Sequence, residues 1–245
     1  MLKNVLASIG IGGMKVDTIV SETTVEPGGR LSGTIGIVGG DVPQRIDAIE
    51  LALVTRAIVE TSGDNKVYGE VTVAVARAAD RMEVAPAQRL DLPFTLEVPP
   101  SAPLSIGPVH TALRTRLDVP MALDPRDSDA VRIVPDAAQR SVFEGMQRAG
   151  FRLGEVEVEY KPRRVPPFLQ EFDFKPTSFR DWGVEEVEVA FLPRSGGGYE
   201  VLLTVDSRGG LFSMGLERGY RLAVPATGAD PEDVAAAVRQ AIGRR

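Results

Sequence analysis

Alternation of apolar and polar residues, rather than helical periodicity, dominates the chain from Lys15 onward. In the stretch RLSGTIGIV, every second residue is apolar or glycine, and glycine pairs stand before and after it. Such alternation over short segments is typical of strands with one buried and one solvated face. The first-half segments with this pattern are 15–26, 30–38, 44–60, 67–79, 92–98 and 110–123. Because no helix of crossover length separates them, they predict an antiparallel β-sandwich.

The second half opens with a helical pattern and then returns to alternation. Asp136 is the predicted N-cap of a short amphipathic helix, and Gly150 is its predicted stop. Strand patterns follow at 155–160, 168–174, 187–191 and 201–205, and the segment from Asp230 onward predicts a closing helix. The whole chain is therefore predicted to be mainly all-β, with two antiparallel β-sandwich domains in tandem and a few short helices.

The two halves meet at LDPRDSD, residues 123–129, which places three aspartates in a short stretch with prolines around it. A calcium loop of the EF-hand type requires glycine at its sixth position and glutamate at its twelfth, and neither register of this stretch provides them. Aspartates in short polar runs instead bond to the backbone of turns. We therefore predict domains 1–126 and 127–245, with an interdomain hinge formed by Asp124, Arg126, Asp127 and Asp129.

Composition and charge exclude several function classes. The chain has 245 residues, 43% of them hydrophobic, and a net charge of -6, which argues against nucleic acid as a partner. It contains no cysteine and one histidine, His110, so thiolate chemistry is excluded and serine or zinc hydrolysis is disfavoured. Gly10, Gly12 and Gly13 do not complete a dinucleotide fingerprint, because Lys15 occupies the position of its third glycine. We predict a protein that is not an enzyme and holds no cofactor or metal.

The first residues carry a helical apolar stripe at Leu2, Val5, Leu6 and Ile9. This stripe covers about two turns and has a single basic residue beside it, which is too little for stable membrane binding. We expect it to dock on the protein itself, and we predict a cytoplasmic protein without stable membrane insertion.

An alternative function comes from the glutamates of the second half. Glu155, Glu157 and Glu159 alternate along a predicted strand, so successive carboxylates lie about 7 Å apart, within the range of glycosidase pairs. Together with Trp182, they allow a carbohydrate-binding or glycoside-processing β-sandwich. Any strand with alternating glutamates shows this spacing, and only 6% of the residues are aromatic, so an acidic solvent-exposed face is the preferred interpretation.

Several longer segments point to a family. They are ASIGIGG with KVDTIV, VEPGGRLSGTIGIVGGDVPQRIDAIELALVT, TRLDVPMALDPRDSD, GFRLGEVEVEYKPR and PFLQEFDFKPT. In order and spacing they resemble the bacterial sporulation-control protein family, whose members have an arrestin-like fold. The resemblance implies two arrestin-like domains and a cytoplasmic regulator of sporulation, development, stress response or cell division that acts as an adaptor. It transfers no binding residue to this chain.

The partner expected from this resemblance is a protein. A chain with this many strands also exposes sheet edges, which can accept a strand from a partner or from a second copy. We therefore also consider a homodimer formed through sheet edges, motivated by glycine-rich strands such as SGTIGIVGG.

Overall fold

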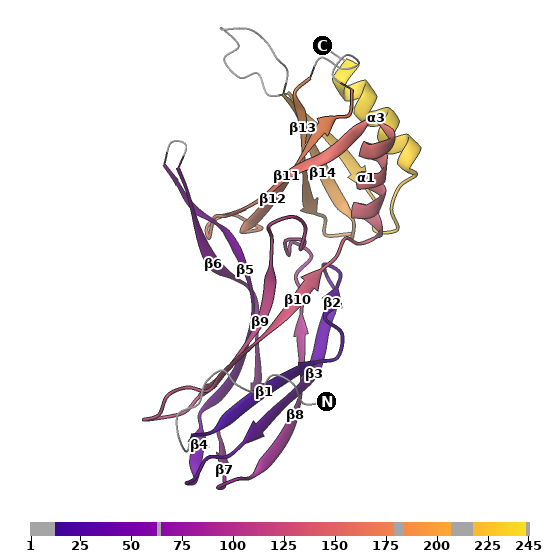
Figure 1. The fold of residues 1–245 in the computed structure, drawn as a ribbon. Coiled ribbons are helices and arrows are strands. Elements are labelled where there is room, and N and C mark those ends of the chain that lie inside the picture. The colour runs from indigo at the N-terminus through magenta and orange to yellow at the C-terminus, as the bar shows by residue number, and fades with distance from the viewer. Residues whose placement is uncertain (1–12, 63–64, 179–183, 207–217, 244–245) are drawn as a thin grey trace. The chain divides into compact units, whose positions relative to one another are not determined.

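The computed structural model describes residues 13–62, 65–178, 184–206 and 218–243 (Figure 1). The predicted N-terminal stripe, Gly10, Gly12 and Trp182 lie outside these residues. The chain forms two compact units. Unit 1 comprises residues 1–56, 70–102 and 110–133, and unit 2 comprises 57–69, 103–109 and 134–245. The mainly-β fold class is confirmed.

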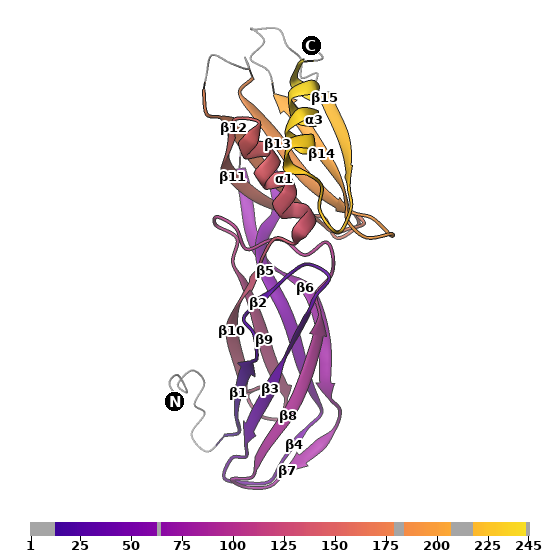
Figure 2. The ribbon, with the colours of Figure 1, turned by 90° about the vertical axis from the view of Figure 1, so that its right-hand side faces the viewer.

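Unit 1 is a β-sandwich (Figure 2). One layer contains β1 (Lys15–Val20), β3 (Arg30–Val38) and β8 (Arg89–Glu97), paired in the order β1-β3-β8. The other contains β5 (Ala48–Ser62), β6 (Asn65–Ala79), β9 (Thr111–Asp118), β10 (Arg126–Ile133) and β2 (Thr24–Val25). The short strands β4 (Gln44–Ile46) and β7 (Met82–Val84) pair with each other. Each segment of the first half that was predicted to be a strand contains a strand in the structure.

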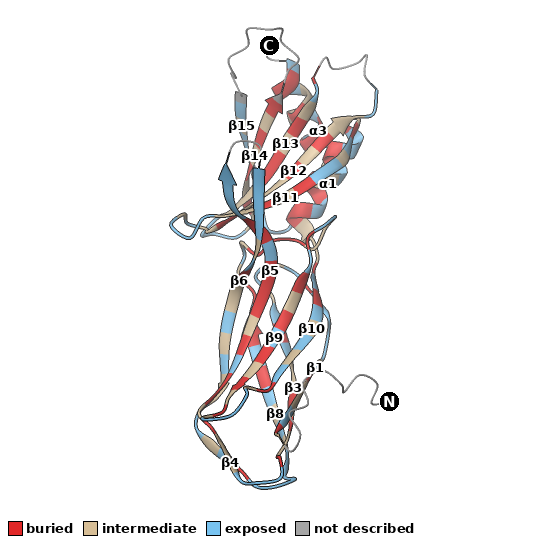
Figure 3. Cartoon of the chain, turned by 60° about the vertical axis from the view of Figure 1, so that its left-hand side comes forward, coloured by how far each residue is buried: buried red, intermediate tan, exposed pale blue. Residues whose placement is uncertain are grey.

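The alternation in the sequence corresponds to the two faces of each strand. Along β9, every second residue is buried, and this alternation is visible in Figure 3. Leu113 of β9 lies directly opposite Leu53 of β5, and both are fully buried, as is Ile35 of β3. Each such side chain contributes roughly 1.5–3 kcal/mol by leaving water. The periodicity therefore specifies the core of unit 1.

Unit 2 is an antiparallel sheet with two helices packed on one face (Figures 1 and 2). Its strands are β11 (Phe151–Tyr160), β12 (Phe168–Pro176), β13 (Glu186–Pro193), β14 (Tyr199–Asp206) and β15 (Arg218–Val224). The helices are α1 (Ala137–Arg148) and α3 (Pro231–Gly243). Phe143 of α1 packs on Phe172 of β12 and Phe191 of β13, with ring centroids 5.1 and 5.6 Å apart. In the described part of this unit, the helices form the layer opposite the sheet.

Helix α1 begins as the sequence predicts. Oδ1 of Asp136 accepts the N–H of Gln139 at 2.9 Å, and Oε1 of Gln139 accepts the N–H of Asp136 at 3.1 Å. This reciprocal capping box satisfies two amides that the helix itself leaves unpaired. After the helix, Gly150 has φ +92°, the left-handed conformation that favours glycine. The predicted N-cap and stop are both confirmed.

The boundary between the units differs from the predicted division after residue 126. The chain passes from unit 1 to unit 2 between Ile133 and Val134, because β10 continues to pair with β9 of unit 1 as far as Val131. Two earlier segments, Ala57–Gly69 and Pro103–Val109, also belong to unit 2. Within unit 2, Ile58 of β5 pairs in parallel with Glu159 of β11. Whether a segment of the first half joins unit 2 depends on long-range pairing, which local sequence patterns do not encode.

Candidate functional site

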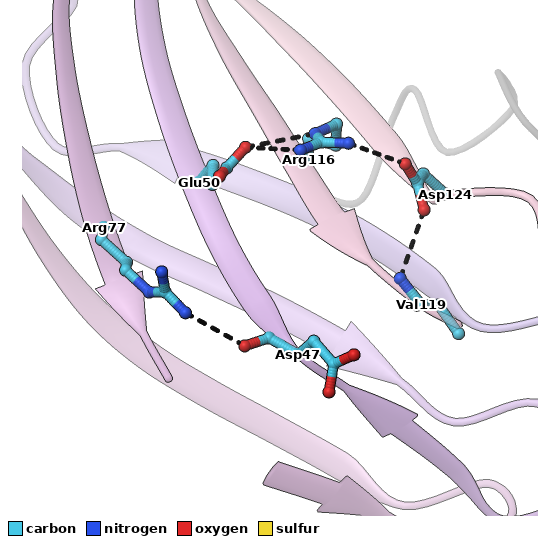
Figure 4. Close-up of polar contacts among 6 residues, drawn as sticks. All are labelled: Asp47, Glu50, Arg77, Arg116, Val119 and Asp124. Carbon is cyan, nitrogen blue, oxygen red and sulfur yellow. Dashed lines mark hydrogen bonds and ion pairs between the residues drawn. The ribbon is translucent and has the colours of Figure 1, made fainter. Parts of the chain in front are cut away.

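The four predicted hinge residues all lie inside unit 1. Asp124 occupies the loop between β9 and β10, where its carboxylate accepts the N–H of Val119 at 3.2 Å and Nη1 of Arg116 at 3.0 Å (Figure 4). Arg116 also donates to Oε2 of Glu50 at 2.7 Å. The predicted bond from an aspartate to the turn backbone is confirmed for Asp124, and it fastens this loop within unit 1. The role of these residues as a hinge stays a prediction.

The other three predicted hinge residues belong to β10. Arg126 is exposed and lies opposite Arg116 of β9 in the ladder. Asp127 accepts the backbone N–H of Thr18 at 2.6 Å, and Asp129 is half-buried, with Oδ2 inaccessible and without a hydrogen-bond partner among the described residues. Burial, followed by the charges of Asp127 and Asp17, raises the pKa of Asp129 to about 6. In the described part of the chain, no group of three or more His, Cys, Asp or Glu side chains is placed to hold a metal ion.

His110, the single histidine of the chain, is exposed. Its backbone carbonyl accepts the hydroxyl of Thr55 at 3.0 Å.

The glutamates of the second half belong to a wider charged surface, which we call the carboxylate face of unit 2. The buried aromatic residues of β12, such as Phe172, point to the helices, so the alternate residues of these strands lie on the opposite side of the sheet. That side carries Glu155, Glu157 and Glu159 of β11, Glu171 and Asp173 of β12, and Glu186 and Glu188 of β13. Three neighbouring strands therefore contribute carboxylates to one surface.

Two pairs of carboxylates on this face lie directly opposite each other. Glu157 of β11 is opposite Glu171 of β12, and Asp173 of β12 is opposite Glu188 of β13. Burial raises the pKa of Glu171, and the charges of Glu159, Asp173 and Glu157 raise it further. Burial, then Glu186 and other carboxylates, likewise raises the pKa of Asp173. Like charges directly opposite on a sheet are destabilising, so this arrangement weakens unit 2.

Cations contact the carboxylate face at its sides. Lys66 of β6 places Nζ 2.5 Å from Oε1 of Glu157, and this hydrogen bond is the main reason that the pKa of Lys66 is raised. Burial favours a higher pKa for Glu159, but Lys161 at 2.8 Å and Arg164 at 3.1 Å lower it below the ordinary value. The face therefore already accepts ammonium and guanidinium groups from its own chain.

Sequence reasoning identified only part of this face. The alternation of Glu155, Glu157 and Glu159 was visible, and their prediction as an acidic face is consistent with their placement. Glu171 and Asp173 carried a signal too, because they alternate with Phe172 and Phe174. What the sequence lacked was the register that brings β11, β12 and β13 side by side. Trp182, the aromatic residue of the carbohydrate alternative, lies outside the described residues.

Comparisons with known proteins point to one family. The family model described as SpoOM protein matches residues 2–209. The sporulation-control protein spo0M of Bacillus subtilis (strain 168) is 35% identical over 211 residues, which cover 84% of this chain and 80% of that protein. The crystal structure of Spo0M from Bacillus subtilis superposes with a TM-score of 0.84 at 30% identity, covering 96% of this chain and 99% of the other.

Proposed function

This chain belongs to the SpoOM protein family, and from that premise we propose that it is a non-enzymatic cytoplasmic regulator that acts by binding a partner protein through the carboxylate face of unit 2. The family membership supports a role in sporulation control or in a related developmental process. The absence of cysteine is compatible with a reducing compartment such as the cytoplasm.

The observation that carries this proposal is the direct opposition of Glu157 to Glu171 and of Asp173 to Glu188. Like-charged pairs cost stability, and natural proteins tend to keep such local conflicts at functional surfaces. A partner segment rich in lysine and arginine would relieve the repulsion when it binds. Charge complementarity of this kind also speeds association and selects against acidic partners.

The contacts at the side of the face support the same chemistry. Lys66 and Arg164 approach the carboxylates at 2.5 and 3.1 Å, so groups of the kind that we propose for the partner fit this surface. Bidentate guanidinium pairing with carboxylates is a strong and directional contact. The partner we propose is therefore a protein that presents a cationic segment.

Affinity capture from the native host tests the proposal. The full chain would be compared with Glu171→Gln/Asp173→Asn, and with Glu70→Gln/Glu97→Gln as a control on exposed carboxylates of unit 1. We expect the first variant to lower recovery of the specific partner at least about tenfold, equivalent to about 1.4 kcal/mol, and the control to retain it.

Two results would count against this function. Equal recovery by all three proteins would show that the carboxylate face is not the binding surface. Enrichment of glycans with no specific protein would overturn the adaptor proposal and favour the carbohydrate alternative.

A further inference from the structure

The end of the β5–β6 hairpin forms an exposed part of unit 2, which we call the β5–β6 arm. The arm comprises the described residues 59–62 and 65–68, and all of them are exposed (pale blue in Figure 3). At its base, Ala57 and Ile58 are buried, and Ile58 pairs in parallel with Glu159 of β11. A two-stranded hairpin with both faces in water is only marginally stable by itself. The arm is therefore anchored at its base and depends on side-chain contacts beyond it.

Lys66 connects the β5–β6 arm to the carboxylate face. Its Nζ lies 2.5 Å from Oε1 and 2.6 Å from Oε2 of Glu157, so one ammonium group donates to both oxygens of the carboxylate. Glu157 lies directly opposite Glu171, and Lys66 therefore neutralises one member of a like-charged pair. A cation of the chain itself thus occupies a carboxylate that the proposed partner would bind.

The contact between Lys66 and Glu157 is weak enough to be exchanged. The two side chains are 42% and 28% exposed, and an ion pair in contact with water contributes little to stability, because water screens the attraction and both side chains lose rotamer freedom. A guanidinium group bonds both oxygens of a carboxylate in parallel and with a fixed geometry, which an ammonium group does not. An arginine of a partner therefore competes favourably with Lys66.

We propose that the β5–β6 arm is an autoinhibitory element of the carboxylate face, in which Lys66 occupies Glu157 until a cationic segment of the partner displaces it. This inference rests on the proposed function of the face and adds the means by which the face is regulated. When only a fraction of the molecules has a free site, the apparent affinity for a ligand is reduced by that fraction. The arm therefore raises the intrinsic affinity that a cationic segment needs in order to bind.

Binding of a fluorescent oligoarginine peptide to the full chain, measured by anisotropy, tests this inference. Lys66→Gln is expected to bind the peptide about threefold more tightly than the wild type, because Glu157 is then always accessible. Lys66→Arg keeps the cation and should bind at most as tightly as the wild type. Lys15→Gln makes the same change of net charge on β1 of unit 1, so it controls for general attraction of the peptide. Equal gains in Lys66→Gln and Lys15→Gln would overturn the inference.

Cross-linking without a spacer measures the displacement of Lys66 itself. A carbodiimide joins an ammonium group to a carboxylate as an amide when the two are in contact, so in the free wild-type chain it is expected to link Lys66 to Glu157. A saturating amount of the oligoarginine peptide should lower the yield of this amide severalfold, as measured by mass spectrometry. An uncharged peptide at the same ionic strength should leave the yield unchanged. An undiminished yield with the oligoarginine peptide bound would show that Lys66 is not displaced and would overturn the inference.

The same peptide separates this inference from the proposed function of the face. If Glu171→Gln/Asp173→Asn loses the peptide while Lys66→Gln binds it no better than the wild type, the autoinhibitory role of the arm is wrong and the carboxylate face remains the binding surface. If both of these variants bind the peptide as the wild type does, the carboxylate face is not the binding surface, and both proposals fail.

Discussion

Asp127 of β10 accepts a hydrogen bond from the backbone N–H of Thr18 of β1, with 2.6 Å between the nitrogen and Oδ2. The hydroxyls of Thr18 and Thr115 are 2.7 Å apart in the same region. Since β1 pairs with β3, these polar contacts connect one layer of the unit 1 sandwich to the other. Asp127, one of the residues predicted as a hinge, therefore contributes to the cohesion of unit 1.

Asp129, on the same strand as Asp127, gives unit 1 a stability that depends on pH. The pKa of Asp129 is about 6 in the folded protein against an ordinary value of 3.8, so the folded state retains the proton more strongly than the unfolded state. The associated stability is present below pH 3.8 and is lost as the pH rises to about 6. Asp129→Asn removes this loss, so at neutral pH it should raise the free energy of unfolding by about 1 kcal/mol, after allowance for partial exposure.

Denaturant unfolding at acidic and neutral pH measures this effect for both proteins. The advantage of Asp129→Asn should vanish at the acidic end, where the wild-type carboxyl is also neutral. A constant difference between the proteins at both pH values would show that Asp129 does not titrate as described.

Glu171→Gln should stabilise unit 2 while weakening partner binding. The pKa of Glu171 is raised by burial and then by neighbouring carboxylates, so its ionisation opposes folding as the pH rises through that pKa. Removing the charge should raise the free energy of unfolding at neutral pH by about 0.2–1 kcal/mol. Glu200→Gln, which removes an exposed ion pair with Arg221 at 3.2 Å, is the control and should not stabilise. A less stable Glu171→Gln would contradict the repulsion that we describe.

Gly145→Ala should destabilise unit 2 by disturbing the contact between its helices. A Cβ at residue 145 of α1 would lie 2.5 Å from Cβ of Val234 of α3, which is closer than carbon atoms can pack. Overpacking of this kind costs about 1–3 kcal/mol. Thermal and denaturant unfolding measure the loss. Gly196→Ala, with nothing within 4 Å of the added Cβ, is the control and should be neutral.

Gln170→Leu should also destabilise unit 2. The N–H of Leu104 donates to Oε1 of Gln170 at 2.6 Å, and Nε2 of Gln170 donates to the carbonyl of Leu104 at 2.9 Å. Leucine would leave both backbone groups without their partner, at a cost of about 1–3 kcal/mol. Gln147→Leu, on the exposed face of α1, is the matched control and should change the free energy of unfolding far less. Equal losses in the two variants would refute the role of Gln170.

Local patterns in the sequence predicted most of the elements. Alternation located β3 and β9, and the capping residues Asp136 and Gly150 marked α1, because these signals depend only on neighbouring residues. The resemblance to the sporulation-control family is also confirmed. The bounds of the units could not be predicted, since the prolines around Asp127 look like a linker while the pairing of Asp127 with Thr115 makes this stretch a strand.

The candidate site could be predicted only as far as local alternation reveals it. Glu157 was visible as part of an alternating strand, but its opposition to Glu171 depends on how β11 and β12 pair, and this register includes a shift between Leu153 and Val156. A local irregularity of that kind displaces every later pairing on the strand. The carboxylate face as a whole could therefore be recognised only from the structure.

Lysine cross-linking in native cells would locate the surface of this protein that a partner covers. The chain has five lysines, and Lys66, Lys161 and Lys175 contact carboxylates of the proposed face, whereas Lys15 lies on β1 in unit 1. We predict that cross-links to a partner protein form at Lys66, Lys161 and Lys175. Partner cross-links confined to Lys15, with the other three lysines still reactive toward the free reagent, would contradict it.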